Sequence, residues 1–301
     1  MTFVSWSVTH VSEYRYSTRV DLAHHVAHLV PRGDDRQLVD RCTLQIDPAP
    51  SDVAHGDDSF GNVRSWFSLY GPHDRLRVKA SSRIRVGAAN PLADPETAPA
   101  WEDVRDALRF RAGAPYSPAS EFVFSSPFVP HSRELARYAL HSFSEGRPLA
   151  SAAIDLMHRI YADFKYQPAS TEISTPLLRT FRARTGVCQD FAHVAIGCLR
   201  SIGLSARYVS GYLITEPGPE RTRPVGADAS HAWLSVYCPG FDWLDLDPTN
   251  DTVVEDRHIT VAFGRDYGDV APLRGVIRGG GDHELSVGVD VTRAPAEAGN
   301  D

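Results

Sequence analysis

The chain has 301 residues, of which 42% are hydrophobic and 23% charged, and this composition is typical of a folded globular protein. A net charge of −7 at pH 7 argues against nucleic acid or an anionic membrane as the main partner. The sequence shows no apolar run of about 18 residues, no secretory signal pattern and no CxxC pair among its cysteines, so we expect a cytoplasmic protein with reduced thiols.

Residues 1–88 favour strands. Apolar residues alternate with polar ones at Val4, Trp6 and Val8, and again at Ile84 and Val86. A period of two is typical of a strand with one buried face. We therefore expect residues 1–88 to form an antiparallel β domain, a sandwich or a barrel-like sheet.

Three histidines in this domain, His24, His25 and His28, resemble metal ligands at first sight. No carboxylate pair or fourth ligand accompanies them at a useful spacing. We interpret them as structural histidines on a strand and predict no metal site.

Residues 89–149 mix prolines with aromatic residues and are predicted to connect two domains. A short helix fits residues 101–110, and Ser132 resembles an N-cap for a helix over 133–143. Three aromatic side chains in this segment are expected to be buried, because aromatic rings prefer the interior: Phe122, Phe124 and Phe128.

Residues 150–293 are predicted to form a second, catalytic domain, followed by a disordered tail over 294–301. A helix fits residues 150–164, and a second helix begins at Cys188. After that helix the hydrophobic period changes to two, which predicts strands over 204–214, 231–237, 241–246, 258–263 and 285–291. A helix followed by an antiparallel sheet predicts an α+β fold.

Cys188 follows Gly186 closely and lies on the apolar face of its predicted helix, a face shared with Phe191, Ala192, Ala195, Ile196 and Leu199. Unpaired N–H groups and the positive end of the dipole in a first helical turn favour thiolate over thiol. A buried structural cysteine fits the same local pattern. The helix alone leaves both interpretations open.

A thiolate nucleophile needs a neighbouring base, and the base needs a third group that fixes its tautomer. His231 opens one predicted strand and Asp247 ends the next, with Pro239-Gly240 as the turn between them. If the two strands pair, His231 and Asp247 become near cross-strand neighbours. Asp245 shares a strand face with Asp247 and is the alternative partner, although the hairpin register favours Asp247.

Four ordered blocks of the sequence resemble the core of the transglutaminase-like superfamily, in its bacterial branch often described as predicted cysteine proteases. The blocks are Gly186–His193, Ala206–Tyr212, Ser230–Trp233 and Asp247–Thr249. The N-terminal part is similar to the β domain that precedes the core in this branch. The segments that carry this second resemblance are His10–Tyr16, Val30–Arg32, Ile46–Pro50 and Phe60–Asn62.

The resemblance implies a papain-like arrangement, in which a helix bearing Cys188 packs against a sheet bearing His231 and Asp247. These residues would be nucleophile, base and orienting acid, with no cofactor. The Cys188 N–H would be one oxyanion donor. The second is expected among Tyr166, Gln167 and Gln189. Three residues beside the blocks are expected to border the substrate groove: Ser230, Trp233 and Tyr212.

The implied activity is acyl transfer through a thioester on a protein or peptide substrate. Hydrolysis, by a peptidase or amidase, is the expected outcome, because excluding water demands a more closed site. An amine-accepting protein-glutamine transglutaminase and a non-catalytic binding scaffold are the alternatives. The loop over 215–230 leads into His231 and is expected to border the groove. The sequence leaves the oligomeric state open.

Overall fold

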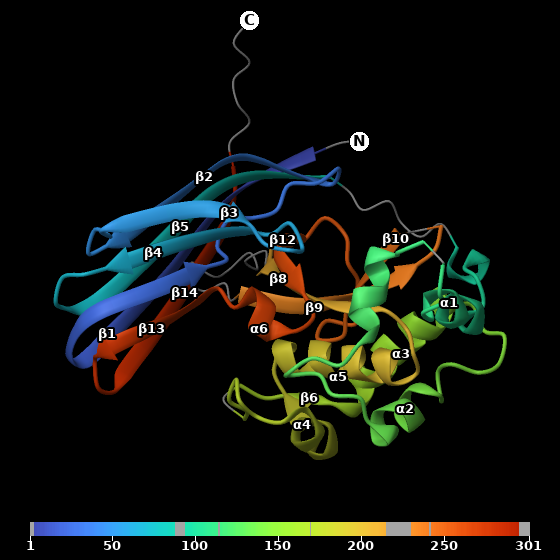
Figure 1. Cartoon of the computed structure of the whole chain (residues 1–301). Helices are drawn as coiled ribbons and strands as arrows, with labels where there is room; N and C mark the ends of the chain where they lie inside the picture. The colour runs from blue at the N-terminus through green and yellow to red at the C-terminus, as the bar shows by residue number, and fades with distance from the viewer. Residues whose placement is uncertain are drawn as a thin grey trace, which may run out of the picture.

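The computed structural model describes residues 3–87, 94–113, 115–168, 170–214, 230–240 and 242–294. An N-terminal sheet lies beside a mixed body in which helices cover a second sheet, and the two are in contact along one side of the molecule (Figure 1). No helix in the described parts of the chain is long and apolar enough to cross a membrane.

The N-terminal sheet follows the alternation seen in the sequence. Its strands are β1 (Phe3–Ala27), β2 (Gln37–Asp47), β3 (Asp52–Asp57), β4 (Val63–Leu69) and β5 (His73–Gly87), in the order β2-β5-β1-β4-β3. Along β5, buried side chains alternate with partly exposed ones, as expected of a strand with one face on a core.

The C-terminal part of the chain returns to this sheet. Strands β13 (Leu273–Gly279) and β14 (His283–Arg293) both pair antiparallel with β1. The turn between them uses Gly279, Gly280 and Gly281, all at positive φ, where other residues are strained. Both strands lie within residues 150–293, the range that the sequence predicted as the catalytic domain, whereas the structure pairs them with the N-terminal sheet.

The second sheet is also antiparallel. It contains β8 (Ala206–Leu213), β9 (Ser230–Cys238), β10 (Asp242–Asp247), β11 (Thr252–Val253) and β12 (His258–Gly264), in the order β11-β10-β9-β8-β12. Two short strands, β6 (Lys165–Tyr166) and β7 (Thr185–Gly186), form a separate parallel pair.

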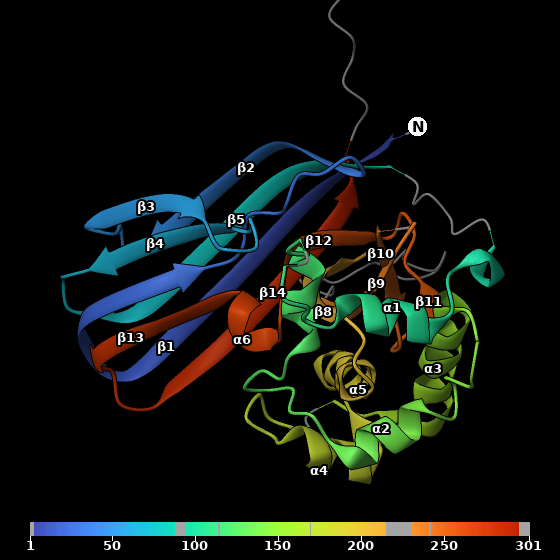
Figure 2. The ribbon, with the colours of Figure 1, turned by 45° about the vertical axis from the view of Figure 1, so that its right-hand side comes forward.

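Helix α5 (Cys188–Ser201) is the centre of the mixed body and contacts β8 and β9 on one side. It is seen end-on in Figure 2, with other helices on its remaining sides. The other helical elements are η1 (Pro95–Thr97), α1 (Trp101–Leu108), η2 (Pro118–Val123), α2 (Arg133–Ala139), α3 (Leu149–Asp163), α4 (Leu177–Ala183) and α6 (Tyr267–Val270). A helix bearing the candidate cysteine on an antiparallel sheet confirms the expected α+β fold.

Details of the connecting segment differ from expectation in one place. Ser132 caps α2, since its hydroxyl accepts a hydrogen bond from the Glu134 N–H at 3.1 Å. Phe122 is buried and Phe128 is half-buried. Phe124 is 66% exposed, so the expectation that it is buried was wrong. It follows the last residue of η2, where the extended backbone turns its ring outward.

Side-chain amides join the two sheets. Gln37 donates to the Thr260 carbonyl at 2.7 Å and accepts from the Thr260 N–H at 2.9 Å. Asn62 makes the same pair of bonds to the Phe263 backbone, at 2.8 and 2.9 Å. Each side-chain amide therefore bonds the backbone of β12 as a residue of a paired strand would. Together the two amides fix the N-terminal sheet against the mixed body.

Candidate active site

Cys188 is the first residue of α5, and the turn before it is tightly held. The Asp190 carboxylate accepts hydrogen bonds from the Val187 N–H at 2.9 Å and from the Thr171 hydroxyl at 2.6 Å. A Cβ at Gly186 would lie 2.7 Å from the Asp190 Cβ, closer than real side chains come. Glycine at 186 therefore lets the carboxylate close the first turn, which places Cys188, half-buried, at the helix start.

His231 connects Cys188 with Asp247. The His231 Nε2 lies 2.7 Å from the Asp247 Oδ2, and the imidazole lines the same cleft as Cys188, which is close enough to raise the pKa of the ring. Because Nε2 faces the carboxylate, Nδ1 is the nitrogen left for the thiol. The hairpin pairs Leu246 with Leu234, so His231 and Asp247 are diagonal neighbours two positions apart and not directly opposite.

The Asp247 carboxylate is fully buried and accepts hydrogen bonds at both oxygens. Oδ1 accepts from the Thr249 N–H at 2.9 Å, and Oδ2 accepts from the Asn250 side chain at 2.7 Å in addition to His231. Burial alone raises the pKa of this carboxyl, but the bonds from His231, His258 and Asn250 outweigh burial and hold the pKa well below its ordinary value.

The same bonds act on His231 in the opposite direction. Burial lowers the pKa of a histidine, whereas the hydrogen bonds to Asp247 and Cys188 stabilise its cationic form. The net result is a raised pKa, so the imidazolium persists through neutral pH. A cation held beside a thiol favours the thiolate.

A second histidine, His258, hydrogen-bonds Asp247, and the sequence did not predict it as a site residue. Its Nε2 is 3.1 Å from the same Oδ2 that bonds His231. It belongs to β12, two strands away from β9 in the sheet. The His258 ring packs edge-on against Trp233 with ring centroids 5.0 Å apart. No local sequence pattern predicts that His258 belongs to the site, because only the order of the strands in the sheet brings it close to Asp247.

Trp233 lies beneath His231 and not in the groove. It is fully buried, and its ring is nearly parallel to the imidazole, at an interplanar angle of 28°. A Cβ at Gly211 would lie 2.1 Å from the Ile259 carbonyl oxygen and 2.5 Å from the Trp233 ring, so glycine makes room for both the neighbouring strand and the indole. Tyr212 is buried as well, and its hydroxyl lies 3.0 Å from the His10 Nδ1. Among the groove candidates, Ser230 lines the cleft beside Cys188.

The oxyanion candidates occupy different positions. Tyr166 is half exposed, and burial together with the neighbouring Cys188 raises the pKa of its phenol, which keeps the hydroxyl protonated as a donor. Gln167 is exposed, and its N–H donates to the Gly186 carbonyl at 2.9 Å. Gln189 lines the cleft with Cys188. No hydrogen bond among the described residues assigns the second donor to one of the three.

The alternative carboxylate is engaged elsewhere. Asp245 accepts a hydrogen bond from the Ser235 hydroxyl on the neighbouring strand and does not contact His231. Of the predicted groove loop over 215–230 and the predicted tail over 294–301, residues 215–229 and 295–301 lie outside the described residues.

A cleft of about 250 Å³ opens at Cys188 and His231. Its walls come from both bodies of the protein: α5, β8 and β9 on one side, and β1, β13 and β14 on the other. The described residues that line the cleft include no Asp, Glu, Lys or Arg. They are His10, Ser12, Tyr14, Ile173, Val187, Cys188, Gln189, Tyr208, Ser210, Ser230, His231, Ala232, Tyr267, Pro272, Leu273, Leu285 and Val287.

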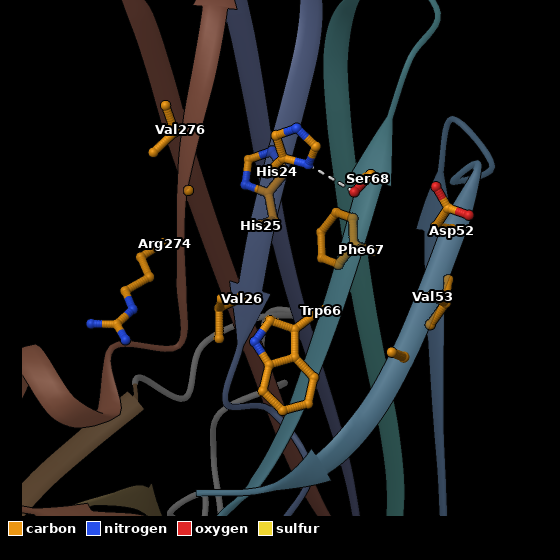
Figure 3. A pocket seen from close by; sticks show the side chains of 12 residues that line it. His24, His25, Val26, Asp52, Val53, Trp66, Phe67, Ser68, Arg274 and Val276 are labelled. Atoms are coloured by element: carbon orange, nitrogen blue, oxygen red, sulfur yellow. Dashed lines mark hydrogen bonds between the residues drawn. The ribbon is translucent and has the colours of Figure 1, made fainter.

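A larger hollow of about 680 Å³ lies on the N-terminal sheet, where side chains of β1, β3, β4 and β13 surround it (Figure 3). His24 Nδ1 lies 2.8 Å from the Ser68 hydroxyl there. The strand register puts Asp52 on the other side of Ser68, so this carboxylate does not orient the imidazole. A serine nucleophile needs the histidine between the two groups. The groups around this hollow therefore do not have the order of a serine triad.

The described residues offer one group of potential metal ligands. His231 Nε2, His258 Nε2 and an Asp247 oxygen lie within 4.8 Å of one another. Their contacts of 2.7 and 3.1 Å have the lengths of hydrogen bonds, so protons account for the arrangement. The three N-terminal histidines are dispersed: His24 bonds Ser68, His25 stacks on Phe67, and His28 lies 3.2 Å from the Ala271 carbonyl.

Comparisons with known proteins identify the family of both parts of the chain. Residues 6–85 match the bacterial transglutaminase-like N-terminal region, and residues 138–248 match the transglutaminase-like superfamily. An uncharacterised protein of Mycobacterium tuberculosis is 43% identical over an alignment of 301 positions. The alignment covers 97% of this chain and 94% of the relative.

Two further proteins are similar at a greater distance. A cysteine-protease candidate from Cytophaga hutchinsonii shares the fold, with a TM-score of 0.76 at 18% identity over 99% of this chain and 93% of that chain. A protein-glutamine gamma-glutamyltransferase of Pseudomonas aeruginosa is 27% identical over 127 residues, or 42% of this chain and 19% of that protein. The matched regions, the full-length relative and the shared fold establish that this chain belongs to the transglutaminase-like superfamily.

Proposed function

We propose that the protein is a cysteine-dependent acyl-transfer enzyme that acts on peptide or glutamine-type amide bonds, with Cys188 as nucleophile, His231 as base and Asp247 as orienting acid. One observation carries this proposal: the His231 imidazole hydrogen-bonds the fully buried Asp247 through Nε2 and lines the same cleft as Cys188 at the start of α5. An aligned thiol, imidazole and carboxylate at the wall of a cleft have the geometry that nucleophilic catalysis requires.

In the first step the Cys188 thiolate attacks the amide carbonyl carbon, and the carbonyl electron pair moves to oxygen. The N–H of Cys188 is free of an intrahelical acceptor because it belongs to the first turn of α5, and it is one donor to the oxyanion. Tyr166 is our preferred second donor, since its phenol stays protonated beside Cys188.

In the second step the oxyanion re-forms the carbonyl, and the carbon–nitrogen bond breaks. The proton held by His231 moves to the leaving nitrogen, so an amine or ammonia departs and a thioester remains on Cys188. His231 is then neutral and accepts a proton from the incoming nucleophile. Asp247 holds the ring in place throughout, because its other hydrogen bonds fix the carboxylate.

Water is our proposed acyl acceptor. Polar residues such as Ser210 and Ser230 line the cleft, and their hydroxyl groups can bind water beside the thioester. The alternative, an amine acceptor, is supported by the partial likeness to the glutamyltransferase of Pseudomonas aeruginosa. A binding scaffold is disfavoured, because such a protein has no need to keep a connected thiol, imidazole and carboxylate.

Mass spectrometry of a peptide with one internal glutamine, incubated with and without a primary amine, tests the proposal. We expect backbone cleavage or conversion of glutamine to glutamate, with the same products when amine is present. Cys188→Ser is the control and should abolish them. Amine adducts as the main product would support the transglutaminase alternative, and identical products from Cys188→Ser would refute a role for the thiol.

A further inference from the structure

The two walls of the cleft separate in a graded way along the N-terminal sheet. On the face that meets the mixed body, Val8 pairs with Val291 and both are buried, and Val289 is also buried. Two positions further on, Val287 is 47% exposed, and after another two, Leu285 is 49% exposed. The sheet therefore leaves the core at Val287, and the cleft is the opening that results.

The exposed residues at this opening are apolar. Leu285 and Val287 come from β14, and both line the cleft that contains Cys188. Ile173 comes from the mixed body, lines the same cleft and is 55% exposed. Large exposed aliphatic side chains gathered on two walls around a nucleophile need a partner to remove them from water.

Charge supports the same conclusion. The chain is 23% charged, yet the described residues that line this cleft include no Asp, Glu, Lys or Arg. Apart from the paired Cys188 thiolate and His231 imidazolium, the described lining offers a charged substrate side chain no opposite charge in return for the water it loses. An aliphatic or aromatic side chain would bury apolar area on both walls.

We propose that the cleft recognises an apolar side chain next to the reacting amide, held between Ile173 on one wall and Leu285 and Val287 on the other. This inference rests on the proposed function and names its substrate class: peptides or unfolded protein segments with an aliphatic or aromatic residue beside the amide that Cys188 attacks. A volume of about 250 Å³ is below the range of pockets that enclose a whole small molecule. One side chain enters, and the rest of the peptide stays outside.

Two peptidyl chloromethyl ketones test the inference without any assumption about water or amine. They differ in one residue beside the reactive group, leucine in one and aspartate in the other, and both alkylate cysteine with loss of chloride. The rate with each is divided by the rate with iodoacetamide, which is too small to require the subsite. We expect the leucine probe to react about tenfold faster than the aspartate probe, or more.

Substitutions on each wall complete the test. Leu285→Lys and Ile173→Lys should each lower the preference for leucine about tenfold, because they remove apolar area and attract the aspartate probe. Ser286→Lys is the matched control: it lies on the same strand, is exposed, points to the opposite face and pairs with Glu13, so the preference should persist.

The outcomes separate this inference from the proposed function. Rapid iodoacetamide labelling with no preference between the probes, or a preference that Leu285→Lys and Ile173→Lys leave intact, would overturn the subsite while Cys188 remains a nucleophile. Slow labelling of wild-type Cys188 by iodoacetamide would overturn the proposed function, and the subsite with it.

Discussion

At the scale of single residues, Asp247 is the most heavily bonded group of the site. Its Oδ2 lies within hydrogen-bond distance of His231, His258 and the Asn250 side chain. Each of these bonds stabilises the carboxylate and not the carboxylic acid. A buried anion with so many donors is held in one orientation. Its hydrogen bond to His231 therefore fixes the orientation of the imidazole ring.

His258→Phe should destabilise the protein by about 1.5–3 kcal/mol, the contribution expected of a hydrogen bond to a charged group. Phenylalanine keeps a ring against Trp233 but cannot donate to Asp247. The free energy of unfolding in urea measures the effect. His24→Phe is the control, because His24 is exposed and bonds only the neutral Ser68. Equal losses from the two substitutions would contradict a special role of His258.

The sequence predicted part of this site at the residue scale. The hairpin turn at Pro239-Gly240 brings β9 and β10 together, so the contact of His231 with Asp247 follows from local pattern. His258 did not follow, because β12 reaches the site by pairing with β8, on the far side of β9. Both faces of the central strand β9 are buried, so its sequence does not alternate between apolar and polar residues. The sequence therefore could not show which face of the strand carries Trp233.

At the scale of elements, α5 is fixed at both ends. Asp190 closes its first turn against Val187. Near its last turn the buried Arg200 donates to the Ala206 carbonyl and the Arg265 carbonyl, each at 2.7 Å. Burial lowers the pKa of Arg200 to about 10, which still leaves the guanidinium charged at neutral pH. The helix therefore holds Cys188 in a fixed position relative to β9.

Gly186→Ala should destabilise the protein by about 1–3 kcal/mol, as overpacking does, and slow the alkylation of Cys188. The added methyl group would collide with Asp190 and push the first turn of α5 away from its position. Gly71→Ala is the matched control, because a Cβ there meets nothing within 4 Å. A Gly186→Ala protein that unfolds and reacts like the Gly71→Ala protein would contradict this account of the turn.

The elements themselves could be predicted where the periodicity is strong. The spacing of Phe191, Ile196 and Leu199 predicts α5, and all three are buried. Strand β13 was missed, because Leu273–Gly279 contains two arginines and two glycines and most of its residues are exposed. Such a strand is held by pairing with β1 and not by burial of a face, so it leaves little pattern in the sequence.

At the scale of the whole molecule, the N-terminal sheet does more than precede the mixed body. Gln37 and Asn62 bond the backbone of β12, the strand that carries His258. Strands β13 and β14 return to β1 and supply a wall of the cleft. The candidate active site therefore lies between two parts of the chain that are far apart in sequence, and local patterns could not place that wall.

The measurement that tests the central claim most directly is the rate of Cys188 alkylation by iodoacetamide as a function of pH, read by peptide mass spectrometry. The raised pKa of His231 keeps the imidazolium beside the thiol through neutral pH. We predict rapid alkylation at about pH 6, where an ordinary thiol is almost wholly protonated, and loss of this reactivity in His231→Ala.

Cys42 provides an internal control in the same digest, since burial raises the pKa of its thiol and it has no histidine partner among the described residues. It should react only at alkaline pH in both proteins. If instead Cys188 followed the profile of Cys42, and His231→Ala left that profile unchanged, the thiol and the imidazole would not act as a pair and the acyl-transfer account would be wrong.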